Sequence, residues 1–212
     1  MKKLFVLLMM ASLMLPTQAK SLRELWVNMP DTLLPAFNKN LRLEFADLLD
    51  MGVKPEVKNL LGEECQMDTL TADYLRLSTS TSGSIQLKLL RQDGGDSLLC
   101  VVKTFAGPEK ESEVKFFDQS WKEMDGVQYL PTDVGQVKRY LQSKPDTMTD
   151  ARYEELSRMI EPVMWYASLS EKDEVISFGV SLPLLPNAEK VQVNAILMQR
   201  KFKWNGKRFN EI

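Results

Sequence analysis

The stretch Ile85-Gln-Leu-Lys-Leu-Leu-Arg-Gln-Asp-Gly-Gly-Asp-Ser-Leu-Leu-Cys-Val-Val-Lys-Thr-Phe105 decides the fold. In its first part, Ile85, Leu87 and Leu89 alternate with more polar residues, which is the pattern of a half-buried β-strand. Asp93-Gly94-Gly95-Asp96 follows and is typical of a tight hairpin turn. The more apolar residues 98–105 complete the pair, so the stretch predicts an antiparallel hairpin.

Further strands are expected on both sides of this hairpin. Residues 65–70 and 74–79 show strand patterns around a short turn, and residues 114–118 lead into Trp121 after a turn at Gly107-Pro108. These strands are close together in the chain, and we expect them to form a first β segment.

The residues that precede this segment are expected to be helical. Ser21-Leu-Arg-Glu24 is a capping-box pattern that opens a short helix through Trp26. Asn38 or Asn40 can cap a second helix, which Gly52 ends.

A third short helix is expected to start at Pro55, because proline is favoured at the first helical position. In this interpretation Val57, Leu60 and Leu61 point inward, and Gly62 ends the helix.

A second β segment is expected towards the C-terminus. Residues 122–148 are irregular, with a short helix near 134–141, and Asp150 can cap a helix over 151–160. The strands are expected at 163–169, 176–182, 191–197 and on both sides of the hairpin turn Asn205-Gly206.

Together these patterns predict an α+β protein with N-terminal helices and two antiparallel β-meander segments. Each segment follows helical sequence and ends with Phe and Trp beside Lys. The two segments with their preceding helices are either a tandem repeat of one α+β unit or two unrelated meanders. The expected organisation is a signal peptide at 1–19, helices and the first β segment at 20–125, a connection at 126–148, and a helix with the second β segment at 149–212.

Residues 1–19 have the features of a cleavable secretory signal. Lys2 and Lys3 form a basic start, residues 4–15 are apolar, and Pro16 breaks the run. Thr17-Gln18-Ala19 places small residues at the positions required for a cut after Ala19. No later stretch approaches the roughly 18 apolar residues of a membrane span. We expect a periplasmic or secreted protein without a membrane span.

Composition excludes several classes of function. The chain has 27 Lys and Arg, 29 Asp and Glu, and no His. Loss of Lys2 and Lys3 with the signal leaves 25 basic residues and a net charge near −4, which argues against nucleic-acid binding. Without His, Ser-His-Asp and Cys-His catalysis and zinc sites with His ligands are excluded. No phosphate-binding loop is present, and we expect neither cofactor nor metal.

Cys65 and Cys100 are the two cysteines of the chain. An even number in an exported protein permits one disulfide. Cys100 also lies in an apolar run, which suits a buried thiol equally well. The sequence leaves both alternatives open.

No set of residues identifies a catalytic site. Ser112-Glu-Val-Lys115 matches the Ser-x-x-Lys motif of acyl-transfer enzymes, but that chemistry needs one helical turn and the surrounding pattern is a strand. The acidic clusters at 63–64, 154–155 and 171–174 lie at turns and helix starts, not as two facing carboxylates. We therefore predict no catalytic residue.

Trp121 and Trp204 are the candidate ligand contacts. An indole can stack on a sugar or a peptide, and Trp204 lies beside a hairpin tip, where a binding surface can form. Packing in the core is the alternative for both.

Several stretches resemble an uncharacterised family of exported proteins from Bacteroidales. They are Val27-Asn-Met-Pro-Asp-Thr-Leu-Leu-Pro35, Asn38-Lys-Asn-Leu-Arg-Leu43, Val57-Lys-Asn-Leu-Leu-Gly62, Phe116-Phe-Asp118, Ser181-Leu-Pro-Leu-Leu185 and Trp204-Asn-Gly206. The resemblance covers nearly the whole chain after residue 19. It implies a location in the envelope of a Gram-negative bacterium, and it carries no activity or catalytic residue.

The leading hypothesis is a non-enzymatic protein that binds another envelope component, either a protein or a glycan. The alternatives are a carboxylate-dependent hydrolase of glycan or peptide, and a purely structural envelope protein. A pocket with two facing carboxylates would favour the hydrolase.

Overall fold

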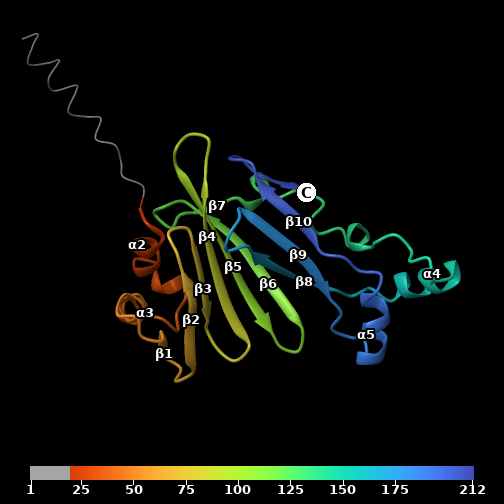
Figure 1. Ribbon diagram of the computed structural model, residues 1–212, viewed down its shortest axis with the longest axis horizontal. Coiled ribbons are helices and arrows are strands. Elements are labelled where there is room, and N and C mark those ends of the chain that lie inside the picture. The colour runs from red at the N-terminus through yellow and green to blue at the C-terminus, as the bar shows by residue number, and fades with distance from the viewer. Residues whose placement is uncertain (1–19) are drawn as a thin grey trace, which may run out of the picture.

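Two short helices begin where the sequence predicts them. The computed structural model describes residues 20–212 (Figure 1), and the predicted signal peptide lies outside the described residues. Helix α2 (Leu22–Val27) begins with the capping box, in which Ser21 Oγ accepts from the Glu24 N–H at 3.2 Å and the Glu24 carboxylate accepts from the Ser21 N–H at 2.9 Å. A 3-10 turn, η1 (Asp31–Leu33), leads to helix α3 (Lys39–Asp50), which Asn38 caps.

Seven consecutive strands form one antiparallel meander, sheet 1, in which each strand pairs with the next along the chain. The predicted hairpin is its centre, because β4 and β5 pair from Gly83 with Phe105 to Arg91 with Ser97. The strands are β1 (Glu56–Lys58), β2 (Glu64–Leu70), β3 (Tyr74–Ser78), β4 (Gly83–Arg91), β5 (Ser97–Ala106), β6 (Lys110–Phe117) and β7 (Glu123–Met124).

A second antiparallel sheet, sheet 2, is formed by the C-terminal residues in the order β11-β10-β9-β8. The connection before it contains two 3-10 turns, and Thr149, one residue before the expected Asp150, caps the helix that follows. The elements are η2 (Gly126–Gln128), η3 (Val137–Tyr140), α4 (Asp150–Arg158), β8 (Met164–Leu169), β9 (Val175–Ser181), α5 (Asn187–Asn194), β10 (Arg200–Trp204) and β11 (Phe209–Glu211).

Sheet 1 lies between two apolar layers. On β5, Leu99 and Val101 pack against the N-terminal helices, whereas Cys100 and Val102 pack against sheet 2. Figure 1 shows α2 and α3 beside sheet 1 at one end of the molecule and α4 and α5 at the other end, beyond sheet 2. Sheet 2 therefore turns one face towards sheet 1, and no layer of helices from residues 20–212 covers the other face, its outer face.

The two sheets are joined by polar contacts as well as by the apolar core. The Gln86 side chain of sheet 1 accepts from the Leu169 N–H on the edge strand β8 at 2.7 Å. At another corner the two predicted hairpin turns meet, because the Asp93 N–H donates to the Gly206 carbonyl at 3.2 Å. Both contacts give hydrogen-bond partners to groups that would otherwise be left unpaired.

The prediction of a helix that starts at Pro55 is wrong. Val57 pairs with Cys65 in an edge strand, β1. The Asn59 side chain then accepts from the Leu61 N–H at 2.9 Å and turns the chain, with Gly62 at φ 83°. A local side-chain bond of this kind competes with helix formation. Leu60 and Leu61, expected inward, are exposed.

The strand expected at 191–197 is also wrong, because these residues belong to α5 and its C-terminal end. Pro186 precedes the helix at its N-cap position. Val193 and Ile196 are fully buried against α4, three residues apart, whereas Val191 is 72% exposed. Residues 191, 193, 195 and 197 alternate as in a strand, and over such a short stretch this pattern is ambiguous. The residues that are buried, Val193 and Ile196, have the spacing of a helix instead.

The structure confirms an α+β fold with antiparallel sheets. The β segments form two sheets that share a core. Their strand numbers differ, seven against four, and the tandem repeat stays a prediction. None of the helices within residues 20–212 is long and apolar enough to cross a membrane.

Candidate functional site

A cleft of about 370 Å³ opens on the outer face of sheet 2. This volume lies within the range of small-molecule sites. Sheet 2 forms its floor, while the β5–β6 hairpin and α5 form its walls. The polar residues that line it are Glu109, Lys110, Tyr166, Ser181, Lys190, Asn194 and Gln199.

Tyr166 forms the aromatic part of the floor. It lies on β8 directly opposite Gly179 of β9. A Cβ atom at position 179 would collide with the phenol ring, so the ring rests on the bare backbone of the neighbouring strand. Glycine is required here for close approach and not for a positive φ.

The Tyr166 hydroxyl is hydrogen-bonded within the cleft. The Gln199 side-chain amide donates to the phenol oxygen at 3.1 Å. The Lys110 ammonium lies 5.9 Å from the ring centroid, within the range of a cation–π contact.

An ion pair joins the two walls of the cleft. Lys190 of α5 contacts Glu109 of the β5–β6 hairpin at 2.5 Å, and the two side chains are only 19% and 27% exposed. Partial burial reduces solvent screening, so this pair fixes the wall more firmly than a fully exposed pair would.

Two larger cavities offer less to a ligand. The cavity of about 640 Å³ beside Lys20 contains Asp118, but this carboxylate already accepts from the Ser120 N–H and hydroxyl and from the Lys122 N–H. The cavity of about 570 Å³ beside α4 contains Tyr153, whose hydroxyl donates to the Gln142 carbonyl. These polar groups are already partnered within the protein.

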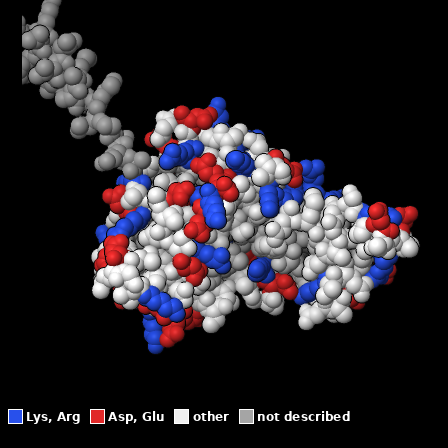
Figure 2. Space-filling model, in the orientation of Figure 1, with Lys and Arg blue, Asp and Glu red and all other residues white. Residues whose placement is uncertain are grey.

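On the face shown in Figure 2, the surface charge does not mark any single site. Figure 2 shows Lys, Arg, Asp and Glu side chains interspersed over this face of the molecule, with a broad uncharged area in the part that holds α5. On this face, attraction of a ligand therefore depends on local groups and not on a large patch of one sign.

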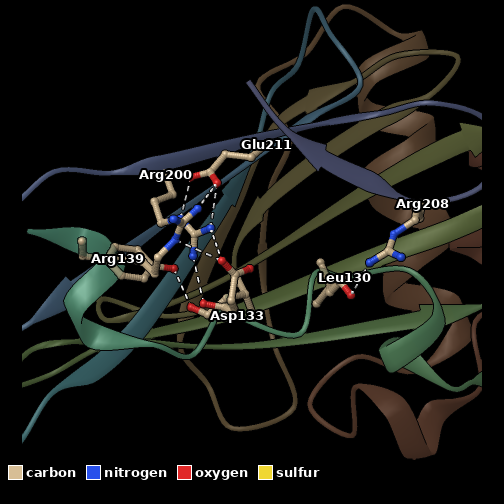
Figure 3. Close-up of polar contacts among 8 residues, drawn as sticks. Leu130, Asp133, Arg139, Arg200, Arg208 and Glu211 are labelled. Carbon is tan, nitrogen blue, oxygen red and sulfur yellow. Dashed lines mark hydrogen bonds and ion pairs between the residues drawn. The ribbon is translucent and has the colours of Figure 1, made fainter.

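The most buried charged cluster is structural. Arg200, whose side chain is 1% exposed, bonds Glu211 at 2.7 Å and Asp133 at 3.0 Å, and Arg139 contacts the same two carboxylates (Figure 3). The hydrogen bond from Arg200 lowers the pKa of Glu211 to about 2. With its partners supplied by the chain itself, the cluster fastens the connection and β11 to β10.

The two predicted ligand contacts have packing roles, and the expectation for Trp204 is corrected. Trp204 is 4% exposed, and its indole N–H donates to the Arg91 carbonyl at 2.6 Å. Trp121 packs on Phe117 and donates to the Leu25 carbonyl at 3.1 Å. Trp204 lies in the core between the sheets, and Trp121 joins sheet 1 to α2.

The two cysteines are free, buried thiols and not a disulfide. Cys65 on β2 faces the N-terminal helices, and Cys100 on β5 faces sheet 2. With two strands between theirs, they are separated by about 14 Å along the hydrogen-bonding direction alone. A disulfide requires Cα atoms within about 7 Å, so this pairing would need a different sheet.

Ser112 and Lys115 do not form an acyl-transfer pair. Ser112 shares a hydrogen bond with Thr104 at 2.7 Å on the face turned towards sheet 2. Three residues along a strand, Lys115 points to the opposite face, where it contacts Glu113 and Glu123.

Sequence reasoning missed Tyr166, Lys110 and Gln199. Alternation within the expected strand at 163–169 is the one signal that could have placed Tyr166 on an outer face. Nothing in the sequence indicates that residues 110, 166 and 199 meet, because three separate segments bring them together.

Fold and cleft define an α+β protein of two packed antiparallel sheets with a tyrosine-floored cleft on an outer face. The family model described as "Protein of unknown function (DUF3256)" matches residues 14–209, and the chain belongs to this family.

A similar solved structure is that of a domain of an uncharacterized protein from Porphyromonas gingivalis W83, a member of the Bacteroidales. The two chains are 20% identical, with a TM-score of 0.73 over 92% of this chain and 98% of that chain. The likeness shows the fold alone. No match was found among curated proteins. Membership in an uncharacterised family with a Bacteroidales relative agrees with the predicted resemblance, whereas export stays a prediction.

Proposed function

We propose that the protein is a non-enzymatic, periplasmic or secreted protein that holds another component of the cell envelope in the cleft over Tyr166. The observation that carries this proposal is the convergence of an aromatic ring, a lysine and two amide side chains on one cleft. Clefts with a few convergent polar groups are the usual sites of small ligands.

The arrangement of carboxylates in the cleft favours a binding function over a hydrolase. Glu109 is the one carboxylate among the described lining residues, and it is paired with Lys190. A glycosidase needs two facing carboxyl groups, one of which is kept protonated by a raised pKa. Outside the cleft, hydrogen bonds from Ser21 lower the pKa of Glu24, and the hydrogen bond from Arg200 lowers the pKa of Glu211. Both shifts are opposite to the raised pKa that a glycosidase acid needs.

A location outside the cytoplasm is supported by residues 1–19, whose basic start, apolar run and small-residue site have the order of a secretory signal.

The test is retention of envelope material by the chain 20–212. Immobilised protein is incubated with a Gram-negative envelope extract, and separately with glycan and peptidoglycan fractions. We expect Tyr166→Ala and Gln199→Ala to abolish retention. Lys201→Ala, an exposed position on β10 outside the cleft, is the matched control and should retain the same material. Retention that survives both cleft variants, or no retention from any fraction, would contradict the proposal.

A further inference from the structure

We infer that the cleft over Tyr166 selects a sugar that carries a carboxylate. This inference rests on the proposed function and names the chemical class of the ligand. It follows from the charges, the free hydrogen-bonding groups and the position of the cleft.

The charge of the cleft is positive by one unit and is localised at Lys110. Of the three charged lining residues, Glu109 and Lys190 form an ion pair with each other. Lys110 makes no ion pair with another described residue and lies over the Tyr166 ring. One unpaired ammonium beside an aromatic ring suits a single negative charge. A phosphate dianion would be better matched by a second free cation, and Lys190 is already occupied.

The uncharged groups around the ring match hydroxyl groups. Because Gln199 donates to the phenol oxygen of Tyr166, the phenol hydrogen and the Gln199 carbonyl oxygen remain available to a ligand. Asn194 adds an amide with both a donor and an acceptor. A sugar hydroxyl is itself both donor and acceptor, so one ring can satisfy several of these groups together.

The apolar parts of the cleft complete a sugar site. Tyr166 offers an aromatic face, and Leu197 and Met198 line the cleft beside it. Aromatic side chains combine an apolar face with a polar end. The cleft is at the small end of the range for ligand sites, which suits one or two sugar rings.

The position of the cleft disfavours an extended peptide. Peptides that add to a sheet need an unpaired strand edge. The cleft lies on a sheet face instead, and the β8 edge is already bonded through Leu169 to Gln86. A carboxylate bound in the cleft meets the Lys110 ammonium and the phenol hydrogen of Tyr166.

The test is calorimetric titration of the purified protein with three probes. The methyl ester of digalacturonic acid keeps the two sugar rings and removes the carboxylate charge, and N-acetylmuramic acid presents a carboxylate on the sugar of peptidoglycan. We expect at least one of the two acids to bind and digalacturonic acid to bind at least tenfold more tightly than its ester if uronates are the source. Binding of N-acetylmuramic acid alone would assign the source to peptidoglycan.

Variants locate the selectivity. Lys110→Gln should reduce acid binding to the level of the ester, and Tyr166→Phe, which keeps the ring, should weaken both acid and ester severalfold. Lys201→Gln is the control and should leave all affinities unchanged. Because the Lys110 side chain is exposed, an unchanged thermal midpoint should show that K110Q is folded.

Two results distinguish failure of the acidic-sugar inference from failure of the proposed function. If envelope material is retained through Tyr166 but neither acid competes for it, the acidic-sugar inference is overturned and the proposed function stands. If no material is retained and no probe binds, both are overturned. Measurable binding of digalacturonic acid and its methyl ester with equal affinity would also overturn the inference.

Discussion

Gly179 determines where the Tyr166 ring can lie. The ring occupies the space that a side chain at position 179 would fill, and this contact exists only because the two residues are opposite each other on β8 and β9. The floor of the cleft is therefore set by the absence of a single Cβ atom.

We predict that Gly179→Ala displaces the Tyr166 ring and destabilises the protein by about 1–3 kcal/mol, the usual effect of overpacking. Urea unfolding measures the change. Gly135→Ala is the control, because nothing lies within 4 Å of a Cβ at that position, and it should change stability by less than about 0.5 kcal/mol. Equal stability of the two variants would show that the ring does not depend on Gly179.

The cysteines show how local patterns leave a residue's role open. Cys65 and Cys100 both sit in strand patterns, and the sequence allowed either a bond or two thiols. The structure separates them by placing them on opposite faces of sheet 1. Burial raises the pKa of the Cys100 thiol and makes it a weak nucleophile.

At the scale of elements, the hairpin turns and helix starts were predictable, and α5 was not. Turn residues such as Asp93-Gly94-Gly95-Asp96 impose a backbone shape through their own conformational preferences. Residues 187–194 have no such signal apart from Pro186. Their state is decided by packing of Val193 and Ile196 against α4.

We predict that Val193→Ala lowers the free energy of unfolding by about 2 kcal/mol, because it removes fully buried methyl groups. Val191→Ala, at a position that is 72% exposed, should change it by less than about 0.5 kcal/mol. Chemical denaturation of both variants checks this. In a strand, positions 191 and 193 would share a face, so equal effects would contradict the helix.

At the scale of the whole molecule, contacts between distant segments hold the two sheets and the connection together. Arg200 of β10, Glu211 of β11 and Asp133 of the connection form one network around the buried Arg200 guanidinium (Figure 3). Its charges are partnered within the chain, which is the condition under which a buried guanidinium is tolerated.

We predict a pH-dependent contribution from Glu211. Its pKa is lowered from 4.5 to about 2 in the folded state by the bond from Arg200. The unfolded chain therefore binds this proton more readily, and the stabilisation is complete above about pH 4.5 and is lost as the pH falls towards 2.

Urea unfolding of wild type and Glu211→Gln at several pH values between 7 and 2.5 tests this. The difference in stability between them should be constant from pH 7 to about pH 5 and should shrink below it. Glu154→Gln, which removes an exposed ion pair with Arg158, is the control and should show a much smaller difference. A Glu211 difference that persists unchanged at pH 2.5 would contradict the assignment.

The sequence by itself determined the class of fold and the elements with strong local signals. Alternation marked most strands, Asn205-Gly206 and Asp93-Gly94-Gly95-Asp96 marked the hairpins, and Ser21 and Asn38 marked the first two helices. These signals succeeded because each acts through backbone preferences within a few residues. The absence of His also excluded the chemistries that require it.

Only the tertiary structure decided the cleft, the state of the cysteines and the roles of the tryptophans. Tyr166, Lys110 and Gln199 are brought together by two sheets and a hairpin, and no local pattern records which distant residues become neighbours. Trp204 lay beside a turn in the sequence, yet packing of the two sheets buried it. Burial and proximity depend on the closing of the whole fold, whereas turns and caps depend on a few adjacent residues.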